Sequence, residues 1–336
     1  MKNILVTGGA GFIGSNFINH ILDERDDYNI INLDKLTYAG NLENLKSSEG
    51  NKNYHFVKGD ITNHELVDYL FNQYNIKYVI NFAAESHVDR SILGSEVFFQ
   101  TNVIGTNVLL ETSRRYDVEK FLQVSTDEVY GSLGETGLFT EKTSISPNSP
   151  YSSSKASADL LAMSFYETYG FPVLITRCSN NYGPLQFPEK LIPLMILNSL
   201  ADKKLPVYGD GLNVRDWIYV IDHNKAIDLV FEKGRVGEVY NIGASQEMTN
   251  IEIIKLVLNI LGKSEDLIEF VKDRPGHDRR YAIDSSKIQN ELGWKPEYKF
   301  EEAIVKTVEW YKENKNWWER IISGAYQDYY KTQYGK

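Results

Sequence analysis

The sequence has little cysteine, no long apolar run and no excess of positive charge. Its single cysteine, Cys178, excludes an internal disulfide framework, and we interpret it as a small buried residue rather than a nucleophile. No apolar run approaches the ~20 residues that a membrane-spanning helix needs, and the mean hydropathy of -0.37 agrees. A net charge of -10 disfavours non-specific binding to nucleic acid. We therefore expect neither a membrane nor a nucleic acid as partner.

The sequence also lacks a signal-peptide h-region, because a strand pattern starts directly after Met1–Asn3. It has no internal repeat, no low-complexity tract and no linker rich in Ser, Gly or Pro. With 42% hydrophobic and 12% aromatic residues, 336 residues can bury a large core without disulfides or a structural metal. These absences predict a cytoplasmic protein, without a metal site, whose parts fold together.

In the first half of the chain, short apolar runs alternate with longer amphipathic ones. The runs with strand character are residues 3–7, 29–33, 78–82 and 121–124. Those with apolar residues at helical spacing are 12–22, 66–71, 95–116 and 152–169. Residues 62–65 have the form of a capping box that starts at Thr62. The alternation predicts βαβ units and therefore a Rossmann-type, doubly wound parallel sheet.

After Pro184 the pattern loosens into loops, followed by helical spacing over residues 250–261 and 301–312. We expect residues 1–183 to form a dinucleotide-binding domain with the catalytic residues. Residues 184–336 should form mainly a smaller, substrate-binding lobe that is interleaved with the first domain. Trp310, Trp317 and Trp318 are expected to pack a helix, and the tyrosine-rich segment 326–334 receives no interpretation.

The strongest local signal is a glycine-rich turn between the first strand and the first helix, with glycines at positions 8, 11 and 14. Without Cβ atoms the backbone can approach a pyrophosphate, and the N–H groups at the start of the helix supply partial positive charge. Asp34 ends the second strand 20 residues after Gly14, where an acid that binds the adenosine ribose is expected. Because this carboxylate would repel a 2′-phosphate, the pattern favours NAD over NADP, although the adjacent Lys35 weakens the preference.

Tyr151 and Lys155 form a Tyr-x-x-x-Lys pattern, which places both side chains on one face of a helix. A cationic Lys beside a Tyr lowers the pKa of the phenol and favours a phenolate base. Taken alone, the pattern is common in helices. Together with the glycine-rich turn and with Thr126 at the end of a later strand, it predicts oxidation of a substrate hydroxyl, to which Thr126 donates a hydrogen bond.

Several motifs are similar to those of the extended short-chain dehydrogenase/reductase family, and the similarity covers essentially the whole chain. They are GGAGFIG, NFAAESHVD, NVIGT, STDEVYG, YSSSK, SNNYGP and RPGHDRR. The resemblance implies a homodimer in which the helices at 95–116 and 152–169 pair with their copies as a four-helix bundle. Both helices carry more apolar surface than a sheet face alone would cover.

The resemblance also implies the residues of two binding sites. Those expected to bind NAD are Gly8, Gly11, Phe12, Ile13, Gly14, Asp34, Lys35, Thr37, Asp60, Ile61, Ala83, Ala84, Thr101, Tyr151, Lys155 and Asn181. Those expected to bind a sugar nucleotide are Ser86, Thr126, Asn180, Lys190, Leu191, Pro206, Tyr208, Arg215, Asn250, Arg274 and His277. Guanidinium groups suit a diphosphate, and the Tyr208 ring suits a base. Four of these residues also have a simpler interpretation. Asp60 could be a helix cap, Asn180 part of a turn, Lys190 a solvated lysine and Tyr208 an aromatic residue at the rim of the site.

Asp127 and Glu128 follow Thr126 directly, and this pair resembles the sugar-nucleotide 4,6-dehydratases of the family. Elimination of water from a sugar needs a base and an acid, and one carboxylate in each role would supply them. The sequence therefore predicts a dehydratase for a nucleotide-linked glucose, with dTDP-glucose as the substrate that the resemblance implies. A 4-epimerase, a dehydratase for a CDP- or GDP-linked sugar and a non-enzymatic NAD-sensing module are the alternatives.

Overall fold

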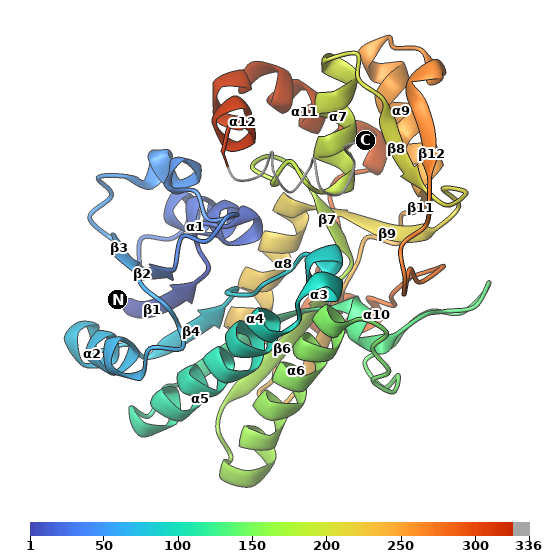
Figure 1. Ribbon diagram of the computed structural model, residues 1–336. Coiled ribbons are helices and arrows are strands. Elements are labelled where there is room, and N and C mark those ends of the chain that lie inside the picture. The colour runs from blue at the N-terminus through green and yellow to red at the C-terminus, as the bar shows by residue number, and fades with distance from the viewer. Residues whose placement is uncertain (325–336) are drawn as a thin grey trace.

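The computed structural model describes residues 1–324, and its largest element is a seven-stranded parallel sheet (Figure 1). The strand order is β10-β6-β5-β4-β1-β2-β3. The strands are β1 (Lys2–Thr7), β2 (Tyr28–Asp34), β3 (Tyr54–Lys58), β4 (Tyr78–Asn81), β5 (Lys120–Thr126), β6 (Val173–Cys178) and β10 (Val239–Ile242). The chain order reverses between β1 and β4, which is where ligands bind in such sheets. This topology confirms the predicted doubly wound fold.

Helices cover both faces of this sheet because successive residues of each buried strand point to opposite sides. Ile4 and Val6 of β1 pack on the side of α1 (Phe12–Glu24), α8 (Val220–Lys233) and α10 (Ser286–Leu292). Leu5 packs on the other side. That side is covered by α2 (His64–Tyr74), α5 (Thr106–Arg115) and α6 (Pro150–Tyr169). Each face of the sheet therefore has its own apolar core.

The seventh strand comes from the second half of the chain. After the smaller lobe has begun, the chain returns through α8 to β10, which pairs with β6 from Val239↔Ile175 to Ile242↔Cys178. The large sheet therefore contains a strand from beyond residue 184, and the division of the chain at residue 183 stays a prediction.

The helix predicted over residues 95–116 is observed as three successive segments. These are α4 (Glu96–Phe99), a π-helical segment η2 (Gln100–Gly105) and α5. A short helix, α3 (Val88–Leu93), precedes them. Figure 1 shows α4, α5 and α6 lying side by side along one flank of the sheet. Wide π turns of this kind are often found at functional sites, and η2 faces the pocket described below.

The smaller lobe is built mainly from residues after Asn180. Its strands are β7 (Asn180–Tyr182), β8 (Leu205–Tyr208), β9 (Val214–Tyr219), β11 (Glu247–Thr249) and β12 (Ile268–Val271). Its helices are α7 (Leu191–Leu200), α9 (Asn250–Leu261), α11 (Phe300–Glu313) and α12 (Lys315–Ile322). Trp317 is buried in its aromatic core and Trp310 and Trp318 pack against it, as predicted. The tyrosine-rich segment 326–334 lies outside the described residues.

Three short 3-10 segments complete the described elements: η1 (Leu42–Ser48), η3 (Asp127–Tyr130) and η4 (Glu265–Leu267). The capping box predicted at Thr62 is wrong. Asn63 caps α2 instead, since its side chain accepts a hydrogen bond from the Leu66 N–H at 3.1 Å. Asn is at least as good an N-cap as Thr, so the later residue starts the helix.

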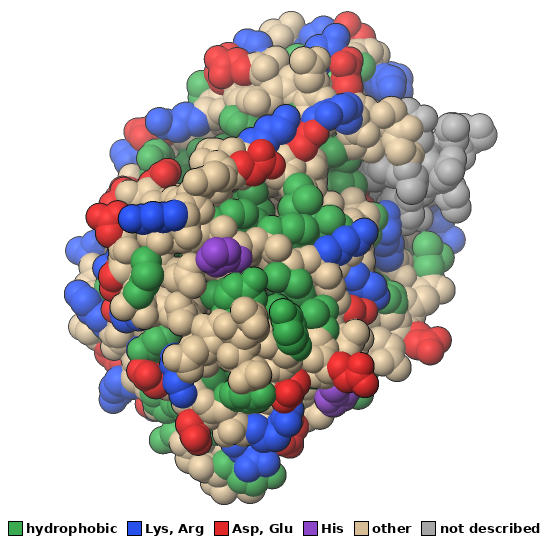
Figure 2. Space-filling view, turned by 90° about the vertical axis from the view of Figure 1, so that its left-hand side faces the viewer, with side chains coloured by type: hydrophobic (Ala, Val, Ile, Leu, Met, Phe, Trp, Pro, Cys, Tyr) green, Lys and Arg blue, Asp and Glu red, His purple; other side chains and the backbone are tan. Residues whose placement is uncertain are grey.

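On the face shown in Figure 2, positive and negative side chains are mixed around a central area where hydrophobic side chains gather. Within residues 1–324, none of the helices has the length and apolar character that crossing a membrane requires.

Candidate active site

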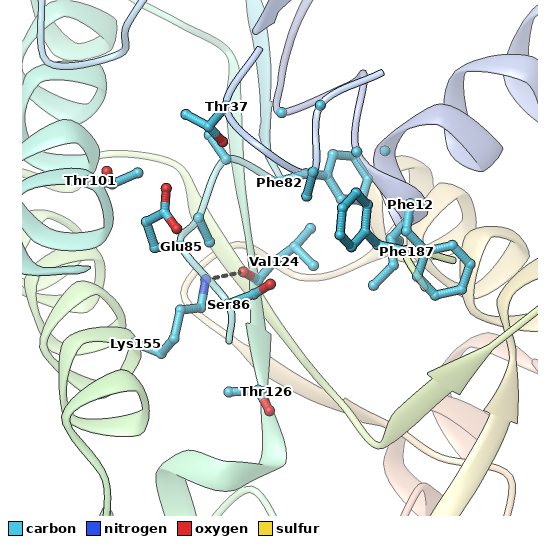
Figure 3. Close-up of a pocket in the computed structure, with 18 of the residues that line it drawn as sticks. Phe12, Thr37, Phe82, Glu85, Ser86, Thr101, Val124, Thr126, Lys155 and Phe187 are labelled. Carbon is cyan, nitrogen blue, oxygen red and sulfur yellow. Dashed lines mark hydrogen bonds between the residues drawn. The ribbon is translucent and has the colours of Figure 1, made fainter. Parts of the chain in front are cut away.

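One pocket lies at the carboxyl ends of the parallel strands and brings together most of the predicted site residues (Figure 3). All sixteen residues predicted to bind the dinucleotide line it, and so do all five predicted catalytic residues. Among the residues predicted to bind the sugar nucleotide, Ser86, Thr126, Asn180 and Lys190 also line it. The sequence patterns therefore converge on a single cavity.

The glycine-rich turn forms one wall of this pocket and has no room for larger residues. Gly8 has φ +69°, and a Cβ there would lie 2.7 Å from the Ala83 backbone. A Cβ on Gly14 would lie 2.5 Å from the Gly8 carbonyl oxygen. Gly11 is the N-cap of α1 and has no side chain to cap the helix. The first N–H groups of α1 are thus presented to the pocket, as a phosphate-binding turn requires.

Asp34 lies at the end of β2, buried beside this turn. Its two carboxylate oxygens accept hydrogen bonds from the Ala10 N–H at 2.9 Å and the Leu36 N–H at 2.8 Å. Burial raises the pKa of Asp34, and these two N–H donors act in the opposite direction. The adjacent Lys35 forms an ion pair with Asp60, with Nζ and Oδ2 2.7 Å apart. Its positive charge is therefore already matched by a carboxylate.

The opposite wall contains η2 and the loop after β4. Thr101 of η2 lines the pocket. The neighbouring Asn102 is buried, and its amide holds both the N–H and the carbonyl oxygen of Glu85, at 2.9 and 3.0 Å. Asn102 also donates to the Ser154 hydroxyl on α6 at 2.8 Å. The π turn thereby fixes the loop of residues 83–86 relative to the helix that carries Tyr151.

Tyr151 and Lys155 lie on α6, and the start of this helix is set by its capping residues. Ser149 and Ser152 form a reciprocal capping box, and Pro150 occupies the first helical turn. Tyr151 thus lies in the first turn, and Lys155 follows one turn later on the same face. The Lys155 ammonium donates to the Val124 carbonyl oxygen at 2.8 Å (Figure 3). Both side chains are buried in the pocket.

The expected lowering of the Tyr151 pKa by Lys155 is not produced by the side chains alone. Burial raises the pKa of Tyr151 well above its ordinary value, and the negative charge of Glu128 raises it further. Burial also lowers the pKa of Lys155, which weakens that residue as a source of positive charge. Phenolate formation therefore depends on further positive charge in the pocket.

Asp127 and Glu128 begin η3, directly after Thr126 ends β5. The Thr126 hydroxyl donates to Asp127 Oδ1 and accepts from the Glu128 N–H, both at 3.3 Å. Asp127 is 1% exposed, and its Oδ2 has no hydrogen-bond partner within the described part of the chain. A buried carboxylate oxygen without a partner is costly unless a ligand satisfies it.

The two carboxylates experience different surroundings. Burial, together with the charges of Glu128 and Asp216, raises the pKa of Asp127 well above its ordinary value. Burial also raises the pKa of Glu128, but Arg274, Arg215 and Lys190 act against it. Asp127 is consequently the more readily protonated of the pair, and Glu128 the more readily ionised. Such a difference separates an acid from a base.

The remaining wall carries residues from the start of the smaller lobe. Lys190 donates to the Ser86 carbonyl oxygen at 3.1 Å, which brings two predicted substrate residues together. Cys178 is 8% exposed, its thiol donates to the Ser125 carbonyl oxygen at 3.4 Å, and burial raises its pKa to about 12. The thiol is thus a poor nucleophile, in agreement with the prediction for this residue.

Seven predicted substrate residues are not part of the pocket lining, and three of them lie close together. Asp89 on α3 accepts hydrogen bonds from Arg274 at 2.8 Å and from the Tyr208 hydroxyl at 3.2 Å. The His277 ring lies edge-on to the Tyr208 ring, with centroids 6.1 Å apart. Asp89 therefore joins Arg274 to Tyr208, and His277 contacts Tyr208.

The other four residues are more dispersed. Arg215 lies over the Tyr281 ring at 4.2 Å and affects the pKa of Glu128. Leu191 and Asn250 are the first residues of α7 and α9, and Pro206 lies on β8 opposite Glu269 of β12. Arg215 is therefore close to the carboxylate pair. The roles of these four residues in substrate binding stay predictions.

Sequence reasoning missed several residues that line the pocket, among them Phe82, Glu85, Phe187 and Glu189. Phe82 and Glu85 belong to the NFAAESHVD motif and could have been included with it. Phe187 and Glu189 lie in a loop without a recognisable pattern. In Figure 3, Phe187 lies beside Phe12, on the side of the pocket opposite Lys155.

The chain is similar over nearly its whole length to known proteins. A family model described as GDP-mannose 4,6 dehydratase matches residues 5–307. A dTDP-glucose 4,6-dehydratase of Xanthomonas campestris pv. campestris is 54% identical over 345 residues, covering 97% of this chain and 98% of the relative.

Two solved structures are similar over nearly the full length. A dTDP-glucose 4,6-dehydratase of Bacillus anthracis in complex with NAD is 56% identical, covers 96% of this chain and 100% of its own, and has a TM-score of 0.90. A dTDP-glucose 4,6-dehydratase of Streptomyces venezuelae with NAD bound is 48% identical, covers 95% and 99%, and has a TM-score of 0.92. The chain therefore belongs to the GDP-mannose 4,6-dehydratase family of extended short-chain dehydrogenases/reductases.

Proposed function

We propose that this chain is an NAD-dependent dTDP-glucose 4,6-dehydratase, which forms a dTDP-linked 4-keto-6-deoxyglucose and water. The observation that carries the proposal is the adjacent carboxylate pair of buried Asp127 and half-buried Glu128, in the same pocket as Thr126, Tyr151 and Lys155. Oxidation and return of a hydride at one carbon, as in an epimerase, needs no such pair. Elimination of water needs both an acid and a base.

The dinucleotide site fits NAD. The glycine-rich turn leaves no space for a Cβ at Gly8 or Gly14, so the backbone is open to a pyrophosphate. Asp34 suits the ribose hydroxyls, and the pairing of Lys35 with Asp60 partly balances the charge that would favour a 2′-phosphate. When bound, NAD accepts a hydride from carbon 4 of the sugar and later returns it to carbon 6, so that the reaction has no net redox change. Its oxidised nicotinamide adds the positive charge that the phenolate of Tyr151 requires.

Oxidation begins when Tyr151 removes the proton of the hydroxyl on carbon 4, while Thr126 donates a hydrogen bond to the same oxygen. The Lys155 ammonium donates to the Val124 carbonyl oxygen of β5, and this hydrogen bond holds the pocket side of α6 in place beside Thr126. The product is a ketone at carbon 4, which makes the proton on carbon 5 acidic.

Elimination then uses the two carboxylates in different roles. Glu128, whose ionised form is favoured by Arg274, Arg215 and Lys190, removes the proton from carbon 5. Asp127, whose raised pKa favours the protonated form, donates its proton to the hydroxyl that leaves carbon 6. A double bond forms between carbons 5 and 6, and water is released. Return of the hydride to carbon 6, and of the proton held by Glu128 to carbon 5, completes the product.

The two parts of the chain bind different ligands. Residues 1–183 hold the dinucleotide and supply the catalytic groups, and residues 184–336 hold mainly the sugar nucleotide. The guanidinium groups of Arg215 and Arg274 suit the diphosphate. The Tyr208 ring suits the base, and His277 suits the sugar or a phosphate. The contacts that join Arg274 and Tyr208 to Asp89, and His277 to Tyr208, support this division.

The enzyme is cytoplasmic and forms a homodimer through a four-helix bundle made of the α4–α5 segment and α6 of each copy. The support is an apolar surface along these helices and the end of α3. Its members Leu93, Val97, Phe99, Ile104 and Leu160 are between 40% and 71% exposed. Large apolar side chains concentrated on one flank are typical of a subunit interface.

The test is incubation of the protein with a panel of nucleotide-linked glucoses, followed by detection of a 4-keto-6-deoxy product. We expect product from dTDP-glucose with no net change in nicotinamide absorbance. A product epimerised at carbon 4, with carbon 6 still hydroxylated, would overturn the dehydratase assignment. Turnover of CDP- or GDP-glucose in preference to dTDP-glucose would overturn the choice of nucleobase.

A further inference from the structure

A chain of buried hydrogen bonds connects α12, the last helix of the described residues, to the glycine-rich turn. The Trp317 indole Nε1 donates to Asn44 Oδ1 at 2.8 Å. The amide nitrogen of the same Asn44 donates to the Ala10 carbonyl oxygen at 3.0 Å. Trp317 and Asn44 are 8% and 4% exposed, so water does not replace these contacts readily.

Ala10 stands between Gly9 and Gly11, in the middle of the turn that fits the pyrophosphate. Its carbonyl oxygen also accepts from the Asn41 N–H at 3.0 Å, and its own N–H donates to Asp34 at 2.9 Å. Glycines on both sides leave the Ala10 peptide few steric restraints of its own. Its orientation therefore depends on these hydrogen bonds.

The connection crosses from one part of the fold to the other. Asn44 lies in η1, beside α1, and its carbonyl oxygen accepts from the Asn19 side chain at 2.9 Å. Trp317 belongs to the aromatic core of the smaller lobe, together with Tyr311. Arg320 of α12 also pairs with Glu43 of η1. Figure 1 shows α12 next to the N-terminal part of the chain.

We infer that Trp317 is a positioning residue for the dinucleotide, which acts through Asn44 by holding the Ala10 peptide in the orientation that the turn needs. Neither Trp317 nor Asn44 is among the described residues that line the pocket. Helix α12 of the substrate-binding lobe thus contributes to cofactor affinity from outside the cofactor site. The inference rests on the proposed function, because it takes NAD as the ligand of this turn.

Trp317→Phe is the direct test, since it removes the N–H donor, keeps an aromatic ring and leaves Asn44 Oδ1 buried without its partner. The matched control is Trp318→Phe. Trp318 is the next residue of α12, and its indole donates at the same 2.8 Å, but to the Tyr311 carbonyl oxygen within the smaller lobe. Both variants lose an indole N–H from the same helix. Only in Trp317→Phe is the lost hydrogen bond part of the chain of contacts that reaches the glycine-rich turn.

The full-length proteins are freed of bound nucleotide and titrated with NAD by calorimetry. We expect Trp317→Phe to bind NAD about tenfold more weakly than wild type, which corresponds to the usual cost of an unpaired buried acceptor. Trp318→Phe should keep the wild-type affinity. Urea unfolding without NAD measures any general loss of stability separately.

A second variant tests the path through Asn44. Asn44→Ala should weaken NAD binding at least as much as Trp317→Phe, and the double variant should show no further loss, because both changes interrupt one chain of contacts. Additive losses would contradict the inference.

The outcomes also separate the inference from the proposed function. If wild type binds NAD and both tryptophan variants bind it equally well, or are weakened to the same extent, the role of Trp317 is wrong and the proposed function stands. If wild type does not bind NAD, both are wrong.

Discussion

Arg177 on β6 and Asp159 on α6 form a buried ion pair, in which Nε donates to Oδ2 at 2.8 Å. The side chains are only 5% and 0% exposed. The Arg177 guanidinium also donates to the Tyr130 hydroxyl at 3.0 Å. Asp159 follows Lys155 by one turn of α6, so the pair fixes the catalytic helix against the sheet.

Asp159→Asn should therefore lower the free energy of unfolding by about 3–5 kcal/mol, because it leaves the Arg177 charge buried without its counterion. Urea or guanidinium unfolding followed by circular dichroism measures the loss. Glu167→Gln, an exposed change on the same helix, is the control and should have little effect. A similar midpoint for Asp159→Asn and wild type would show that the pair contributes nothing.

The pairing of Lys35 with Asp60 leaves the Asp34 carboxylate as the charge that decides between the two nicotinamide dinucleotides. We expect NAD to bind more tightly than NADP by about tenfold or more, because a 2′-phosphate would approach a buried carboxylate. Titration of the nucleotide-free protein with each dinucleotide measures the ratio. Asp34→Ser should reduce the ratio, mainly by weakening NAD binding. Equal affinities in wild type would contradict the role of Asp34.

The residues of the oxidation step and of the elimination step can be separated by mutation. Tyr151→Phe should abolish the whole reaction, since no hydride leaves carbon 4 without the base. Asp127→Asn and Glu128→Gln should keep oxidation but slow elimination by roughly 10²–10⁴-fold each. Single-turnover absorbance of the reduced nicotinamide measures both steps, and the signal should persist in the carboxylate variants. A wild-type rate of dehydration in Glu128→Gln would show that this carboxylate has no chemical role.

The pH dependence of elimination follows from the raised pKa of Asp127. Burial and the neighbouring Glu128 favour the protonated acid, which is the form that donates to the leaving hydroxyl. The rate of dehydration, measured separately from oxidation in single turnovers, should fall as the pH rises through this raised pKa, and it should also fall at low pH, where the base Glu128 becomes protonated. Asp127→Asn should be slow at all pH values and lack the decrease at high pH. An unchanged decrease in the Asn variant would assign it to another group.

Light scattering should report a homodimer at micromolar concentration. Ile104→Glu and Leu160→Glu place charges on the exposed apolar flank of η2 and α6 and should give monomers, because a charge at the centre of an interface loses its hydration. Val305→Glu is the control. Val305 is 43% exposed, similar to Ile104, but lies on α11 of the smaller lobe. A wild-type monomer would rule out the four-helix bundle.

Sequence reasoning succeeded where the signal is local. The glycines at 8, 11 and 14, and Asp34 after the second strand, predict a turn at the pocket wall, and the structure leaves no room for a Cβ at Gly8 or Gly14. Tyr151 and Lys155 could be placed on one helix face from their spacing alone. Asp127 and Glu128 are adjacent in the chain, so their common location needed no tertiary information.

The remaining features depend on contacts between distant segments. Asp89 holds Arg274 across 185 residues, and no local pattern indicates that pair. The pairing of β10 with β6 also depends on the chain returning to the sheet after β9. The raised pKa of Tyr151 follows from burial and from Glu128, which spacing along a helix does not report.

The position of β10 in the chain also determines how long one edge of β6 stays unpaired during translation. Strand β6 is complete at residue 178, whereas its outer partner ends at residue 242. One edge of β6 therefore stays without its partner while the ribosome adds the segment between them. Unpaired strand edges are the sites at which nascent chains associate with one another. During translation the nascent chain can therefore associate with other chains through β6, until β10 has emerged from the ribosome and paired with it.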